Sequence, residues 1–254
     1  MLKPNLLNWQ YLIPLINVSE NEILQIAHTT VATRLHFANL HLYLLLQTYE
    51  KKSSFETGFL QRSLTENIIL DLYSALDALG HVINQIYDLN INYKLVSIDH
   101  RKRSNKKDER RCMRCKLQIT DNNLSELLES TLIRKNSPRD NWYDALVEYR
   151  HQIVHRPHFI FMKTIGNITW LPDDPTIIQS KEKFRFDHEK SEAIIPNYTQ
   201  KREIRYFATS SFSSVLRIIE YVYLMLRTNK RINKQLISLF KSALDSNNDS
   251  NITH

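Results

Sequence analysis

The chain contains very few residues of the kinds that build tight turns and disulfide scaffolds. Its 254 residues include 3 glycines and 2 cysteines. So little glycine argues against a turn-rich β-sandwich, and no glycine-rich phosphate-binding or dinucleotide-binding motif is present. No uninterrupted apolar run approaches the roughly 18 residues that a membrane span needs. The cysteines form one pair, Cys112-x-x-Cys115, which suits a reducing compartment better than a disulfide framework.

The N-terminus is apolar but is interrupted by Pro4, Asn8, Gln10 and Pro14, so it makes a poor signal peptide. We therefore expect a cytoplasmic protein without a membrane segment. With 42% apolar and 24% charged residues, the composition is typical of a soluble globular chain.

The net charge of +7 comes from one segment. Residues 101–116 hold nine basic and two acidic residues, and the rest of the chain holds 25 of each sign. Such a block is usually a solvated loop, and it is also the type of segment that contacts a polyanion. The predicted RNA-binding residues are Arg101, Lys102, Arg103, Lys106, Lys107, Arg110 and Arg111.

Helical periodicity accounts for most of the remaining sequence. Apolar residues recur at steps of 3 and 4, which is typical of amphipathic helices. This pattern predicts helices over 22–49, 60–87, 123–132, 204–226 and 232–244. Ser137-Pro138-Arg139-Asp140 resembles a helix start, and Pro157 would end that helix.

Residues 158–202 differ from the helical segments. FIFMKTIGNITWL is β-like on both sides of Gly166-Asn167, which predicts a hairpin, and residues 183–188 could form a further strand. We therefore predict a mainly α, antiparallel helical bundle with a basic loop and a small insert that contains a β-hairpin. It would be a single domain over 1–243, with inserts near 90–118 and 158–202 and a disordered tail over 244–254.

The stretch EYRHQIVHRPHF, residues 148–159, concentrates chemically active side chains at the end of a predicted helix. Arg150, His151 and His155 allow three interpretations. They could stabilise the helix terminus by opposing its dipole, supply ligands to a metal, or carry acid–base catalysis.

The RHQIVH motif, residues 150–155, resembles that of the HEPN (higher eukaryotes and prokaryotes nucleotide-binding) family: arginine, a polar residue, three more residues and a histidine. Members of that family are helical bundles that commonly dimerise, and many are metal-independent ribonucleases. The resemblance implies that Arg150 and His155 are catalytic here and that no cofactor is needed.

The chemistry of the two side chains fits that implication. Histidine can serve as base or acid near neutral pH, and arginine binds phosphate oxygens through a permanently charged fork. Five residues, however, correspond to about 140° around an ideal helix, so Arg150 and His155 do not share a face. Either the helix end unwinds and turns His155, or a two-fold dimer brings the pairs together.

Zinc binding is the main chemical alternative. His151 and His155 share a helix face, and Cys112 and Cys115 have the spacing of zinc-finger ligands. The two pairs are far apart in sequence, and a single CxxC is ambiguous. We therefore assign no metal site.

Two further residues are assigned supporting roles. His151 would assist Arg150, and Asp77 belongs to a polar line on the second long helix with Ser74, His81 and Asn84. HEPN ribonucleases often place an acidic or polar residue from an earlier helix near the catalytic pair, so the resemblance points to Asp77. Pro157 stands where some HEPN toxins carry a tyrosine that a partner enzyme modifies, so such modification is not expected here.

The expected function is a metal-independent endoribonuclease that leaves 2′,3′-cyclic phosphate and 5′-hydroxyl ends. Its setting would be a toxin–antitoxin or phage-defence system, with an antitoxin or defence-system partner. The alternative is a non-catalytic RNA-binding or protein-interaction module built on the same bundle.

Overall fold

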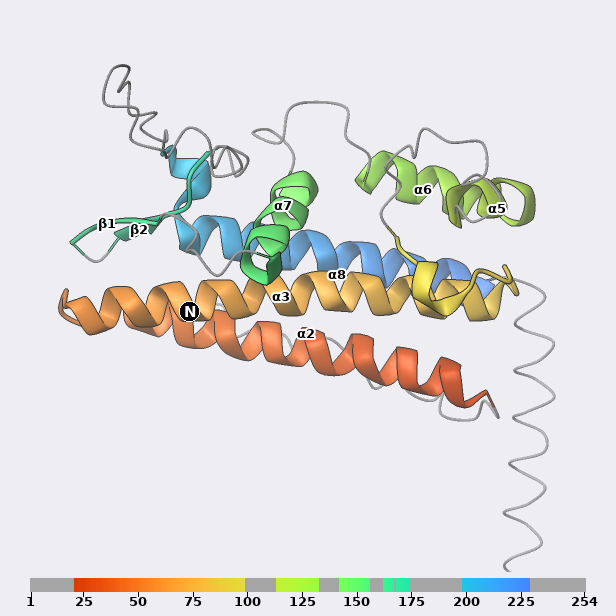
Figure 1. Ribbon diagram of the computed structural model, residues 1–254, viewed down its shortest axis with the longest axis horizontal. Helices are drawn as coiled ribbons and strands as arrows, with labels where there is room; N and C mark the ends of the chain where they lie inside the picture. Colours follow the sequence, from red (N-terminus) through yellow and green to blue (C-terminus); the bar gives the residue numbers. More distant parts are fainter. Residues whose placement is uncertain are drawn as a thin grey trace, which may run out of the picture. The chain divides into compact units, whose positions relative to one another are not determined.

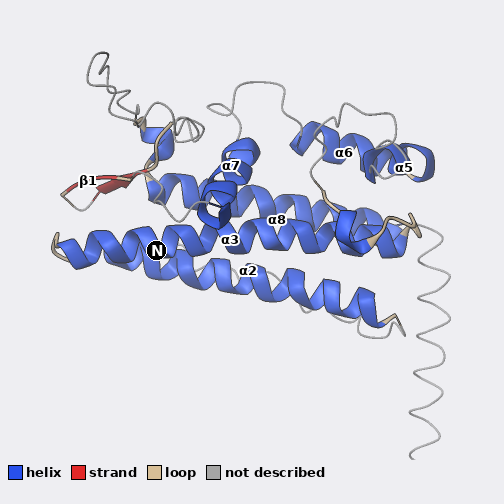
Figure 2. Ribbon diagram, in the orientation of Figure 1, coloured by secondary structure: helices blue, strands red, loops and turns tan. Residues whose placement is uncertain are grey.

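The mainly α fold predicted from the sequence is confirmed by a computed structural model, which describes residues 21–98, 113–132, 142–155, 162–166, 168–173 and 198–228. Figure 1 follows the chain, and Figure 2 distinguishes helices from strands. The α-helices in the described residues are α2 (Glu22–Thr48), α3 (Phe55–Ile86), α5 (Met113–Thr120), α6 (Asn122–Leu132), α7 (Trp142–His155) and α8 (Ile204–Thr228). None of them combines the length and the apolar character of a membrane-spanning segment.

The long helices match their predicted positions except at the start of α3. The apolar pattern predicts a start at residue 60, whereas α3 begins at Phe55. Ser54 explains the earlier start, because its hydroxyl accepts a hydrogen bond from the Thr57 amide at 3.1 Å and so caps the helix. Phe55 is exposed, and an exposed first turn leaves no trace in an apolar periodicity.

The predicted basic loop over 90–118 is wrong for residues 113–118, which belong to α5. Met113 and Leu117 are one helical turn apart and both are buried. A Cβ on Gly80 of α3 would lie 3.5 Å from the Met113 Cε atom and 3.3 Å from the Ile98 amide nitrogen. The glycine therefore allows two segments to approach α3 closely.

The predicted hairpin is confirmed. Strand β1 (Lys163–Ile165) pairs antiparallel with β2 (Ile168–Trp170), and Ile165 lies opposite Ile168. Gly166 has φ of +61°, which an L side chain rarely adopts. The Leu171 amide donates to the Arg202 carbonyl at 2.8 Å, so the hairpin is joined to the short 3-10 helix η4 (Gln200–Arg202).

Several other predicted elements lie outside the described residues. These are the helix start at 137–140, the strand at 183–188, the helix at 232–244 and the tail at 244–254.

The chain divides into two compact units. Unit 1 contains residues 21–33, 75–98, 113–131 and 216–228 of the described chain, and unit 2 contains the remainder. In unit 2, α2 and α3 run antiparallel, joined by residues 49–54 (Figure 1). In unit 1, the His28 Nδ1 atom lies 2.7 Å from the Tyr223 hydroxyl and joins α2 to α8. The single-domain boundaries expected from the sequence remain a prediction.

Candidate functional site

The Arg-x4-His motif occupies the end of α7, in unit 2. Its anchor is Tyr149, which is fully buried and packs edge-on against Phe207 of α8 with ring centroids 5.4 Å apart. The Tyr149 hydroxyl donates to the Pro172 carbonyl at 2.5 Å. The buried Arg202 places its guanidinium 5.9 Å from the Tyr149 ring and 5.5 Å from the Phe207 ring. The residue before Arg150 is therefore firmly held.

Arg150 is half-buried, and its guanidinium carbon lies 4.8 Å from the centroid of the Tyr73 ring on α3. An arginine over a tyrosine face at a partly exposed position gains about 0.5–1 kcal/mol from the ring quadrupole. Arg150 is only partly buried, so the N–H donors of its guanidinium remain accessible beside the ring. The contact therefore restricts the orientation of Arg150 while its donors can still meet an anion.

The structure describes the two histidines of the motif to different extents. His151 is exposed on α7. His155 is the last residue of α7, and its backbone is helical, whereas its side chain lies outside the description. The unwinding that would have turned position 155 toward position 150 is therefore not observed. On an intact helix the two positions remain about 140° apart.

Gln152 is one of the three motif residues between His151 and His155 to which the sequence assigns no role, and it is buried. Neither its amide nitrogen nor its amide oxygen has a hydrogen-bond partner in the described part of the chain. The sequence contains a signal in its spacing, because Gln152 follows Glu148 by four residues and Asp144 by eight. In the structure all three side chains are buried. A row of polar residues on the face of a helix that packs inward is the pattern that distinguishes a buried polar side chain from a solvated one.

The predicted supporting residue Asp77 lies on α3 within unit 1, whereas Arg150 belongs to unit 2. Its support of the catalytic pair therefore stays a prediction. Asn84 of the same polar line has a structural role, since its side chain bonds both the amide and the carbonyl of Ile91 at 3.1 Å.

The seven basic residues predicted to bind RNA all fall within 99–112, which lies outside the described residues, as does Cys112. Cys115 lies on α5 and is partly buried. Among the residues that the structure describes, no three histidine, cysteine or acidic side chains gather in a group suited to a metal ion.

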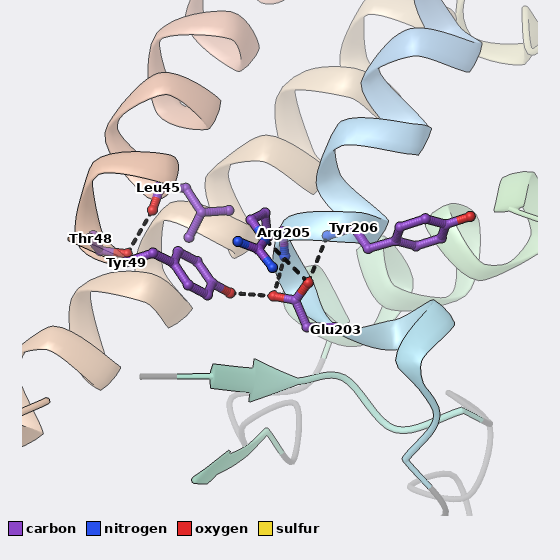
Figure 3. Close-up of polar contacts among 6 residues, drawn as sticks. All are labelled: Leu45, Thr48, Tyr49, Glu203, Arg205 and Tyr206. Atoms are coloured by element: carbon purple, nitrogen blue, oxygen red, sulfur yellow. Dashed lines mark hydrogen bonds and ion pairs between the residues drawn. The ribbon is translucent and has the colours of Figure 1, made fainter. Parts of the chain in front are cut away.

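A second polar cluster surrounds the start of α8 in unit 2 (Figure 3). The Glu203 carboxylate accepts hydrogen bonds from the amides of Arg205 at 3.1 Å and Tyr206 at 3.2 Å, which caps the helix. The Tyr49 hydroxyl donates to the same carboxylate, and the Arg205 guanidinium lies 4.8 Å from the Tyr49 ring. Burial and the hydrogen bond to Glu203 raise the pKa of Tyr49. Because these contacts connect the end of α2 to the start of α8, the cluster is a structural junction between the two helices.

A third cluster joins α2 and α3 through Asp71, also in unit 2. Its buried carboxylate accepts a hydrogen bond from Arg34 Nη1 at 2.9 Å and another from His41 Nδ1 at 3.0 Å. Sequence reasoning read α2 only as an apolar stripe and overlooked both partners. The available signal was the seven-residue separation of Arg34 and His41, which places them on one face of the helix.

No family model, curated protein or solved structure matches the chain.

Proposed function

We propose that the protein is a metal-independent endoribonuclease of the HEPN type, in which Arg150 and His155 carry the chemistry. The observation that supports this most is the setting of Arg150, whose guanidinium lies over the Tyr73 ring and is half-buried near the end of α7. A permanently charged fork held in this way is suited to phosphate oxygens.

In the proposed reaction the RNA 2′-oxygen attacks the adjacent phosphorus as a base removes its proton. The bond from phosphorus to the 5′-oxygen then breaks, and an acid protonates that oxygen. The products are a 2′,3′-cyclic phosphate and a 5′-hydroxyl end. His155 serves as the acid or base, Arg150 neutralises charge on the phosphorane, and His151 and Asp77 support the pair.

Because α7 is helical through His155, we propose that the active form is a two-fold homodimer. Each site would combine Arg150 of one chain with His155 of the other. The setting would be a cytoplasmic toxin or defence system, in which an antitoxin or another defence component controls the activity.

The test is RNA cleavage by purified protein in excess EDTA. We expect activity to persist, and we expect Arg150→Ala and His155→Ala each to lower the rate by at least ~100-fold, because each removes charge stabilisation or proton transfer. Arg62→Gln is the matched control, since Arg62 is a partly exposed arginine paired with Glu66 in unit 2, outside the motif. Activity that EDTA abolishes and zinc or magnesium restores would contradict the proposal.

The second candidate is a non-catalytic RNA-binding or protein-interaction module. It is favoured by exposed apolar side chains of α2 in unit 2, among them Phe37, Leu40, Tyr43 and Leu44. Under this candidate, RNA remains intact at every protein concentration and the motif variants behave like wild type.

A further inference from the structure

The outer face of α2 in unit 2 combines an arginine and a histidine with an aromatic ring. Arg34 and His41 are seven residues apart, which is about 20° of rotation on an ideal helix. Phe37 lies between them, three residues after Arg34 and four before His41, so all three positions fall within about 60°. Neighbours at this spacing are about 5–6 Å apart at Cβ.

Asp71 holds Arg34 and His41 in place through hydrogen bonds. Its side chain is only 6% exposed, whereas those of Arg34 and His41 are 45% and 24% exposed. An ionised carboxylate only accepts hydrogen bonds, so His41 donates from Nδ1 and presents its Nε2 edge away from Asp71. The bond to Asp71 uses one of the five N–H donors of Arg34. The negative charge is covered, and its two partners reach the surface.

The surroundings of this cluster carry no other formal charge on α2. Apart from Glu22, Arg34 is the only Asp, Glu, Lys or Arg side chain in the 27 residues of the helix. Phe37, Leu40 and Leu44 are all exposed, with Phe37 at 42%. An anchored arginine and histidine beside an exposed ring, on an otherwise uncharged face, are complementary to a ligand that joins an anion to a flat apolar group.

We propose that Arg34, Phe37 and His41 form a nucleotide-binding subsite for single-stranded RNA. Arg34 contacts a phosphate, His41 lines the same site, and Phe37 stacks on the adjoining base. Stacking on aromatic rings together with backbone contacts by cations is the general mode by which proteins bind unpaired strands. The choice of RNA rests on the proposed function, whereas the pairing of phosphate and base contacts rests on the geometry of the three residues.

A protein partner is the competing occupant of this face. A second copy of the chain would bring Arg34 toward its own counterpart if α2 packed on itself about a two-fold axis, and like charges would then approach each other. A phosphate avoids that repulsion, because it offers acceptors to the Arg34 guanidinium.

The test is binding of the full-length protein to a labelled oligoadenylate of about eight nucleotides, a length in the range of one single-strand site. All its riboses are 2′-O-methylated, so the proposed cleavage cannot occur. Binding is followed by fluorescence anisotropy at several salt concentrations. Because binding and cleavage are measured separately, RNA that binds without being cut would refute the proposed function and leave the subsite standing.

Phe37 is the discriminating position. We expect both Phe37→Ala and Phe37→Leu to weaken binding about 5- to 150-fold, since both remove the stacking ring. Phe37→Trp should retain wild-type affinity within about threefold, because it preserves a ring. Phe59→Ala is the matched control, because Phe59 is an exposed ring of unit 2 on α3 and should not affect binding.

Arg34→Gln tests the phosphate contact. It should flatten the dependence of log affinity on log salt by about 0.7, the value for one phosphate of a single strand. Arg62→Gln removes another arginine of unit 2 and should leave the slope unchanged. An abasic oligonucleotide should bind wild type and Phe37→Ala equally, because neither complex contains the stacked base.

Circular dichroism and thermal unfolding would show that each variant is folded. Wild-type affinity in both Phe37→Ala and Arg34→Gln would overturn the proposal, as would an absence of oligonucleotide binding by the wild type. A combined result would also overturn it: both Phe37→Leu and Phe37→Ala bind RNA with wild-type affinity, and Phe37→Ala converts a dimer to a monomer in sedimentation. The face would then be an interface between copies.

Discussion

His28 illustrates what burial does to a titratable side chain in unit 1. Its ring packs edge-on against Tyr223 with centroids 5.6 Å apart, and its Nδ1 atom lies 2.7 Å from the tyrosine hydroxyl. Burial lowers the pKa of His28 below its ordinary 6.5 and raises the pKa of Tyr223. Both groups are therefore neutral at neutral pH, and the contact between α2 and α8 is a hydrogen bond between uncharged partners.

Acid should accordingly destabilise the fold through His28. Because its pKa is lower in the folded state, the unfolded chain binds the proton first as the pH falls below 6.5. We expect the free energy of unfolding to decrease from about pH 6.5 down to the folded-state pKa, and His28→Gln to remove that part of the decrease. Urea unfolding at about pH 7.5 and about pH 5.5 measures it. His36→Gln, at an exposed position, is the control, and a decrease of equal size in His28→Gln would refute the assignment.

Individual residues of the candidate site were predictable to different degrees. Arg150 and His155 follow from a local motif, whereas the Tyr73 ring that holds Arg150 follows from packing between α3 and α7. The same limit applies to Asp71, which bonds residues on another helix. A sequence shows which side chains are able to make such bonds, and the tertiary structure selects the partner.

Among the elements, the hairpin gives the clearest prediction because one backbone angle defines its turn. Gly166 has φ of +61° and a Cβ added there would meet nothing within 4 Å, so Gly166→Ala introduces backbone strain without a clash. We expect this change to lower the free energy of unfolding by about 1 kcal/mol.

Gly58→Ala is the matched control within unit 2. Gly58 lies inside α3, and its added Cβ would make an ordinary 3.7 Å contact with Thr164. Alanine favours helix over glycine, so this change should raise the free energy of unfolding by about 0.5–1 kcal/mol. Denaturant unfolding compares the two variants, and effects of the same sign would contradict the assigned backbone conformations.

Elements were predictable where their signal is local and buried. The apolar stripes located α2, α6 and α8 within a few residues, and Gly166-Asn167 located the hairpin. The charged sequence around α5 hid a helix, because its formation depends on burying Met113 and Leu117. Gly80 leaves room for Met113, because a Cβ added to Gly80 would lie 3.5 Å from the Met113 Cε atom, and no local sequence pattern reveals that contact.

At the scale of the whole molecule, the proposed dimer makes a quantitative prediction. Arg150→Ala and His155→Ala chains are each expected to be inactive alone. If every site takes one residue from each chain, a mixed dimer regains one of its two sites, and an equal mixture recovers about one quarter of wild-type activity. Activity assays after mixing and re-equilibration measure this. Either of two outcomes would refute the shared site: a mixture that stays inactive, or a fully active protein that sedimentation shows to be a monomer.

The junction at Glu203 has a consequence for how the chain tolerates changes in length. Tyr49 and Glu203 are 154 residues apart, yet they meet at one carboxylate that also caps α8 (Figure 3). The entropy of closing a flexible loop grows with the logarithm of its length, so doubling the loop adds only about 0.6 kcal/mol. A short insertion in a flexible connection between the two residues therefore adds little to the entropic cost of this contact, whereas a single substitution at either end removes it. The junction sets where α8 begins whatever the length of the chain that leads to it.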